Sequence, residues 1–91
     1  MKSQKEHLEA HAKKQEFGEE VKAFANHLID VLIDERKRQG MTQQEVADIT
    51  GMKAPNITRI ESRKYTPTLD VLVRYANAVG KELHFELVDK S

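Results

Sequence analysis

The chain of 91 residues has no cysteine, no long apolar run and no excess of charge of either sign. Without cysteine it forms no disulfides and no thiolate zinc sites, which is compatible with a reducing cytoplasm. No apolar run approaches the roughly 18–20 residues of a transmembrane helix. The polar N-terminus MKSQKEHLEAHAKKQE lacks the apolar centre of a signal peptide. Fifteen basic residues balance fifteen acidic ones, so the chain is not a generic polycation.

Patterns typical of catalysis or metal binding are also missing. No Ser/His/Asp or Cys/His set, Gly-rich phosphate loop or pair of acids in an evident pocket supports an enzyme, and no cofactor is indicated. His7 and His11 would share one face of a helix, but a metal site needs more ligands and HLEAH is not the HExxH of metalloproteases. The sequence therefore indicates a non-enzymatic domain of one small core, without a metal.

Residues 41–61, MTQQEVADITGMKAPNITRIE, predict two short helices joined by a tight turn at Gly51. Thr42 is a suitable N-cap, and Glu45 stands three residues later, as in a capping box. Pro55 lies near the first turn of the second helix, where its missing N–H costs little. The residues expected to face inward are Val46, Ala47, Ile49, Ile57 and Ile60.

The second of these helices would present a polar, partly basic outer face. That face contains Lys53, Ala54, Asn56, Thr58 and Arg59. A short helix that presents such residues from its N-terminal half suits the major groove of DNA.

The same run resembles the helix-turn-helix of Cro/repressor-type (XRE-like) regulators, a family that includes helix-turn-helix antitoxins. The resemblance covers roughly residues 28–80 and matches spaced positions from Arg36 through Leu72 and Ala76 to Gly80. One position departs from the family. Arg63 stands where a glycine is usual, so the left-handed helix cap expected there lacks its usual residue, while a positive charge is added.

The resemblance implies DNA-contacting residues and a structural ion pair. Gln43 matches a position that hydrogen-bonds a phosphate or base edge, although an isolated glutamine is more often plain helix surface. Arg36 and Glu61 match a partly buried salt bridge between the first and third helices. Ala54 and Pro55 could each touch a thymine methyl, although Pro55 could equally be present simply to start the helix. The expected DNA-binding residues are Gln43, Gln44, Lys53, Ala54, Pro55, Asn56, Thr58, Arg59, Arg63 and Lys64.

Three regions are expected along the chain: a polar N-terminal arm or helix at 1–18, a helix-turn-helix domain at 19–80, and a C-terminal strand and tail at 81–91. Within the domain, apolar spacing predicts a long helix over 19–39 and a last helix capped by Thr68 and stopped by Gly80. The long helix would use Val21, Phe24, Ala25, Leu28, Val31, Leu32 and Glu35, and the last helix Leu69, Leu72, Val73, Ala76 and Val79.

The segment KELHFELV alternates, with Leu83, Phe85 and Leu87 on one side and Glu82, His84 and Glu86 on the other, as in a strand. A lone strand cannot satisfy its own backbone, so it pairs with a second copy or a partner protein, or lies on the core as extended chain. Pairing with a copy would give a homodimer whose recognition helices, about 34 Å apart, face a palindromic operator. A different dimer interface would use the long helix through Phe17, Val21 and Phe24.

The sequence as a whole predicts an all-α, five-helix-like lambda-repressor-type helix-turn-helix domain with one short C-terminal β-strand. It would act as a dimeric, sequence-specific DNA-binding repressor in the cytoplasm, without membrane attachment. The alternative is an antitoxin that neutralises a toxin protein and autoregulates its promoter.

Overall fold

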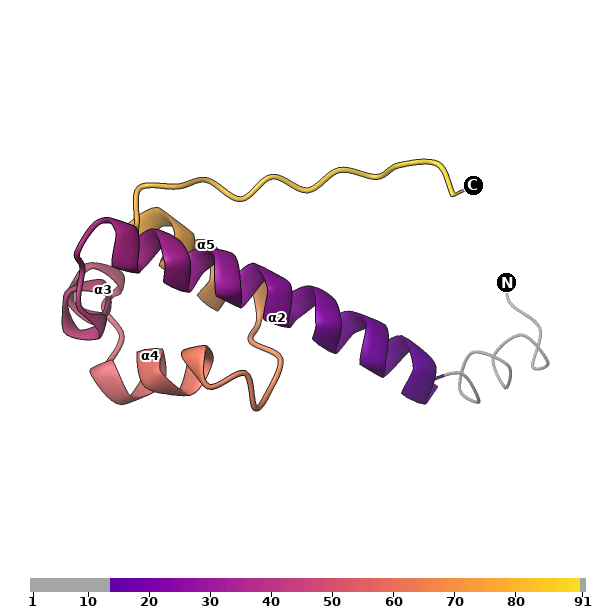
Figure 1. The fold of residues 1–91 in the computed structure, drawn as a ribbon, viewed down its shortest axis with the longest axis horizontal. Helices are drawn as coiled ribbons and strands as arrows, with labels where there is room; N and C mark the ends of the chain where they lie inside the picture. Colours follow the sequence, from indigo (N-terminus) through magenta and orange to yellow (C-terminus); the bar gives the residue numbers. More distant parts are fainter. Residues whose placement is uncertain (1–13, 91) are drawn as a thin grey trace.

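The computed structural model describes residues 14–90, with side chains from Gly18 onward. This part of the chain contains four helices: α2 (Lys14–Arg38), α3 (Gln43–Thr50), α4 (Ala54–Glu61) and α5 (Leu69–Ala78). Figure 1 shows α3, α4 and α5 gathered around the C-terminal half of α2, while the N-terminal half of α2 extends beyond them. The all-helical prediction is confirmed, with four helices in the described residues where the resemblance implied a five-helix arrangement.

Helix α2 begins earlier than expected, because Gly18 does not end the segment before it. The helix runs from Lys14 through Gly18 to Arg38. A glycine inside a helix costs about 1 kcal/mol relative to alanine, which good helix formers such as lysine, glutamate and glutamine on either side can offset. His7 and His11 lie outside the described residues, as does the side chain of Phe17.

The turn chemistry of α3 is as predicted. The Thr42 hydroxyl accepts from the Glu45 N–H at 3.0 Å, and the Glu45 carboxylate accepts from the Thr42 N–H at 3.0 Å, which completes the capping box. Gly51 takes a left-handed conformation (φ 78°), and its N–H donates to the Ala47 carbonyl at 2.9 Å. This conformation ends α3 and lets α4 begin after only two further residues.

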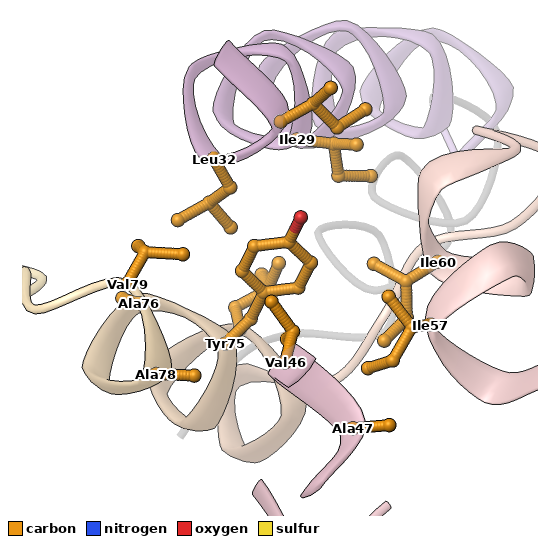
Figure 2. Close-up of a cluster of buried hydrophobic side chains, with 12 residues drawn as sticks. Ile29, Leu32, Val46, Ala47, Ile57, Ile60, Tyr75, Ala76, Ala78 and Val79 are labelled. Atoms are coloured by element: carbon orange, nitrogen blue, oxygen red, sulfur yellow. The ribbon is translucent and has the colours of Figure 1, made fainter. Parts of the chain in front are cut away.

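The core is one cluster to which all four helices contribute. Figure 2 shows the ring of Tyr75 at its centre, between Ile29 and Leu32 of α2, Val46 of α3, and Ile57 and Ile60 of α4. Tyr75 is completely buried, and its hydroxyl points towards α2. The core positions α4 because its two isoleucines are both buried there.

Several apolar residues expected to face inward are exposed instead. In α3, Val46 and Ala47 are buried, whereas Ile49 is 61% exposed on the outward side. The others are Val21, Phe24 and Val31 on α2, and Leu69 and Val73 on α5. For Val21 and Phe24 the reason is that the N-terminal half of α2 extends past the helices that could cover it. These two residues, with Leu69 and Phe85, line an apolar groove.

No strand is present within residues 14–90, so the strand expected over 82–88 is not formed in this single chain. Residues 81–90 run extended beyond α5 (Figure 1). Leu83 is partly buried against the core, Phe85 lines the apolar groove, and Leu87 is fully exposed. The alternating segment therefore keeps an extended course but has no second strand with which to form a ladder.

Candidate nucleic-acid interface

The carboxylate of Glu61, the last residue of α4, receives a bidentate ion pair from Arg36 of α2. Arg36 donates from Nε to one Glu61 oxygen and from Nη2 to the other, each at 2.9 Å. Its Nη1 also donates to the Met41 carbonyl at 2.8 Å. The two side chains are only 11% and 9% exposed, so this pair belongs to the interior rather than to the surface. The structure thus brings together the two residues that the resemblance pairs.

The same carboxylate accepts hydrogen bonds from the two remaining helices. The Tyr75 hydroxyl of α5 donates to Oε2 at 2.7 Å, and Nε2 of Gln43, at the start of α3, donates to Oε1 at 3.0 Å. The amide oxygen of Gln43 accepts in turn from the Thr58 hydroxyl on α4 at 2.7 Å. One acidic group therefore joins all four helices, and we call these five residues the Glu61 network: Arg36, Gln43, Thr58, Glu61 and Tyr75.

The Glu61 network changes the acidity of its members. Burial by itself would raise the pKa of the Glu61 carboxyl, but the hydrogen bonds from Arg36, Tyr75 and Gln43 together lower that pKa below its ordinary value. The hydrogen bond to Glu61 raises the pKa of Arg36 further. Burial, reinforced by the adjacent carboxylate, raises the pKa of Tyr75 well above its ordinary value of about 10. Glu61 and Arg36 therefore stay ionised, and Tyr75 stays neutral, throughout the physiological range.

The outward face of α4 carries side chains that could bind nucleic acid. Lys53 forms the N-cap, Pro55 lies in the first turn, and Asn56 and Arg59 follow on the exposed side. Ala54 is partly buried and packs against the core, so of the two candidates for a thymine methyl, Pro55 is the more accessible. Lys64 is exposed just beyond the helix.

Three of the expected DNA-binding residues on α3 and α4 already form side-chain hydrogen bonds with other side chains of the protein. Gln43 and Thr58 are bonded to each other in the Glu61 network. Gln44, on α3, donates to the Asp48 carboxylate at 2.9 Å. Gln43 therefore orients α3 against α4 in this structure. The long polar side chains of α4 that are directed outward are Asn56 and Arg59.

Arg63 keeps the left-handed conformation even though it is not a glycine. Its φ is 61°, a region in which non-glycine residues are uncommon. Its guanidinium pairs with the Asp30 carboxylate on α2, and it also donates to the Glu61 carbonyl at 3.2 Å. The chain thus makes the usual turn after α4 at some conformational cost, and the charge of Arg63 is partly satisfied within the protein.

Two tyrosines of this region are not predicted from the sequence. Tyr75 lies three residues after Leu72 and four before Val79, so helical periodicity places it on the core face of α5 and could have identified it. Tyr65 follows α4 in an irregular loop, and the guanidinium carbon of Arg59 lies 4.5 Å from the centre of its ring. No periodic pattern indicates a contact between a helix and a loop residue of this kind.

Comparison with known proteins identifies the class of the domain. The helix-turn-helix family model matches residues 32–85, which is more than half of the chain. The chain therefore belongs to the helix-turn-helix family, and the resemblance to XRE-like proteins is confirmed.

Individual relatives are also similar to part of the chain. The chain is 36% identical over 56 residues to an uncharacterised HTH-type transcriptional regulator of Haemophilus influenzae, a match that covers 62% of this chain and 57% of that protein. It is 36% identical over 63 residues to antitoxin HigA1 of Mycobacterium tuberculosis, covering 69% and 42%. It is 38% identical over 53 residues to an uncharacterised HTH-type transcriptional regulator of Methanothermobacter thermautotrophicus, covering 58% and 75%.

The chain spans about half the length of the first two of these relatives: 57% of the Haemophilus influenzae regulator and 42% of antitoxin HigA1. No solved structure matches the chain significantly. In residues 14–90, no group of histidine and acidic side chains is arranged to hold a metal ion. None of the helices in this range has both the length and the apolar character needed to cross a membrane.

Proposed function

We propose that this protein is a sequence-specific DNA-binding transcriptional regulator that reads the major groove with α4. The observation that carries this proposal is the contrast between the two sides of α4. Its inner side is held by two buried isoleucines and by the Glu61 network, whereas Lys53, Asn56 and Arg59 are exposed on its outer side. A short helix with a fixed orientation and an outer polar face is the geometry that base reading requires.

Local charge supports the same proposal, although the chain is neutral overall. Glu61 is the only acidic residue within residues 53–64, and its charge is compensated by Arg36 in the interior. The outward charges of this surface therefore come from Lys53, Arg59 and Lys64. Cations at the two ends of α4 would contact phosphates and set the register, while Asn56 and Arg59 would contact base edges. Repression would follow from occupying a promoter.

Selection of bound sequences from a random DNA pool tests this function directly. The full-length protein should enrich a defined sequence, and Asn56→Ala and Arg59→Ala should each weaken binding to it by about 1–3 kcal/mol, the value of a good bidentate base contact. Arg74→Ala is the matched control, because it also removes one exposed arginine but lies on α5. The proposal fails if no sequence is enriched, or if both α4 variants bind as tightly as the control with their circular dichroism unchanged.

We further propose that the functional unit is a homodimer formed through the C-terminal tail, residues 82–88. In the single chain, Phe85, Leu87 and Val88 are 62%, 102% and 78% exposed. Exposed apolar residues on an extended segment with an unpaired edge favour antiparallel pairing with an identical segment. Two α4 helices held in this way would face successive major grooves of a palindromic operator, about 34 Å apart.

The dimer is tested by a charge placed where it cannot disturb the protomer. Leu87 makes no buried contact in the single chain, so Leu87→Lys should leave the fold intact but shift sedimentation equilibrium towards the monomer and weaken operator binding. Glu86→Gln changes the net charge by the same amount on the neighbouring residue and serves as the control. Truncation after Gly80 should have the same effect as Leu87→Lys. A tight dimer in both variants would place the interface elsewhere, for instance on the exposed Val21 and Phe24 of α2.

A second candidate function, that of an antitoxin, is favoured by the similarity to antitoxin HigA1. In that role the protein would bind a toxin and use DNA binding to regulate its own promoter. A gene for a small basic ribonuclease-like protein directly beside this one would favour the antitoxin. Co-expression would then distinguish the two functions. As an antitoxin, this protein should form a stable complex with the product of that gene and relieve its toxicity; if it does neither, the proposal of a DNA-binding regulator without an antitoxin role stands.

A further inference from the structure

Arg59 differs from every other arginine of the chain in what its guanidinium contacts. The other four each form an ion pair with a carboxylate, namely Arg36–Glu61, Arg38–Glu35, Arg63–Asp30 and Arg74–Asp70. The Arg59 guanidinium has no ion pair or side-chain hydrogen bond within the described residues. Its carbon instead lies over the ring of Tyr65, 4.5 Å from the ring centre.

This contact leaves the hydrogen-bonding capacity of Arg59 unused. A cation over an aromatic ring interacts through the face of the guanidinium, whereas all five N–H donors lie in its plane and point away from its edges. An ion pair with a carboxylate would occupy two of those donors. Arg59 is exposed on the outer side of α4, so its N–H groups remain available to a ligand while its position is restrained by the ring.

The Tyr65 ring is itself held in place by the rest of the protein. Tyr65 is partly buried and packs against the hydrophobic core. It follows the reversal of the chain at Arg63, whose left-handed conformation turns the loop after α4. The ring under the guanidinium therefore belongs to a residue that is itself packed against the core.

We propose that Tyr65 is a positioning residue that presents the edge of the Arg59 guanidinium to a guanine in the major groove. This inference rests on the proposed function and specifies one of its base contacts. Guanine offers the O6 and N7 acceptors that match two parallel guanidinium donors. A long, flexible side chain loses conformational freedom when it binds, and the stacking on Tyr65 reduces that loss because the bound orientation exists before DNA arrives.

The test compares three substitutions of Tyr65 in the full chain, using the selected operator and a set of operators with single base-pair changes. Tyr65→Leu fills space against the core but removes the aromatic face, and it should lower operator affinity by about two- to thirtyfold, the range of a cation–π contact. Tyr65→Phe keeps the face and should rescue affinity. Tyr65→Ala removes packing against the core as well as the aromatic face, so its operator affinity is compared with its thermal unfolding curve.

Base preference separates positioning from a merely structural role. Tyr65→Leu should relax discrimination at the same guanine position as Arg59→Ala, and at no other, whereas a damaged fold would weaken binding to every operator alike. In the Arg59→Ala background, Tyr65→Leu should have no further effect. If Tyr65→Leu keeps the wild-type affinity and preference while Arg59→Ala loses both, the role of Tyr65 is overturned and the DNA-binding function stands. If the wild-type protein selects no sequence, the function itself fails.

Discussion

The Glu61 network predicts that one nearly isosteric substitution, Glu61→Gln, will severely destabilise the fold. The substitution removes the charge that compensates Arg36, whose side chain is only 11% exposed. The new amide group also replaces one of the two carboxylate oxygens by an N–H donor, which then faces Arg36 and either Tyr75 or Gln43, the groups that donate to that oxygen in the wild type. Both effects act in the same direction, because each leaves donors in the interior without an acceptor.

The expected loss is about 3–5 kcal/mol in the free energy of unfolding, the typical cost of removing one partner from a buried ion pair. That is a large fraction of the roughly 5–15 kcal/mol that stabilises a small domain. Urea unfolding followed by far-UV circular dichroism should therefore show a midpoint lowered by at least about 1 M. The melting temperature should fall by at least about 12 °C.

Two further variants serve as comparisons for Glu61→Gln. Tyr75→Phe removes one of the four hydrogen bonds to the carboxylate and should cost about 1–2 kcal/mol, clearly less than Glu61→Gln. Asp70→Asn removes a carboxylate that pairs with Arg74 at the surface, where both side chains are more than half exposed, and should have a small effect. A loss below about 1 kcal/mol for Glu61→Gln would refute the view that this carboxylate is a buried ionic link between the helices.

Three further outcomes are expected. Folding lowers the pKa of Glu61, so the ionised carboxylate stabilises the fold above its unfolded-state pKa of about 4.3, and this stabilisation is lost as the pH falls below that value. The free energy of unfolding should therefore fall less steeply with decreasing pH in this acidic range for Glu61→Gln than for the wild type. Arg63→Gly should stabilise the fold by up to about 1 kcal/mol, because glycine adopts the left-handed conformation without strain and this gain outweighs the lost exposed ion pair with Asp30. Arg63→Val should destabilise the fold, and melting curves with the reverse order would contradict the assigned strain. A plot of log affinity for the operator against log salt concentration should have a negative slope, reduced by up to about one unit in Lys64→Ala and by less in Arg63→Ala, and a salt-insensitive interaction would exclude phosphate contacts by this surface.

Local features of this fold were predictable because they depend on neighbours in sequence. Thr42 and Glu45 form the expected capping box, and Gly51 takes the expected left-handed turn, because both are decided within a few residues. The hydrophobic spacing of α2 and α5 likewise located both helices. The start of α2 differs from the prediction, because the cost of Gly18 inside a helix is small enough for the adjacent helix formers to offset.

Features that depend on tertiary contacts were predicted less well. The pairing of Arg36 with Glu61 came only through the resemblance to a family, since 25 residues separate the two. The exposure of Val21 and Phe24 depends on which helices reach the N-terminal half of α2, and the ring under Arg59 depends on the path of a loop. The strand expected over 82–88 depends on a second chain. The alternating pattern of one sequence can therefore predict that this segment tends to form a strand, but not whether it pairs.

The way in which α4 is anchored has a consequence for the evolution and redesign of this protein. The residues that fix the helix are Ile57, Ile60, Glu61 and the Thr58 hydroxyl, and they all point inward or along the helix surface towards α3. The side chains at positions 55, 56 and 59 are exposed and take no part in these inner contacts. Their side chains can therefore be exchanged as a set without loss of the scaffold, so that a descendant or a designed variant could acquire a new operator while its ancestor's fold is preserved.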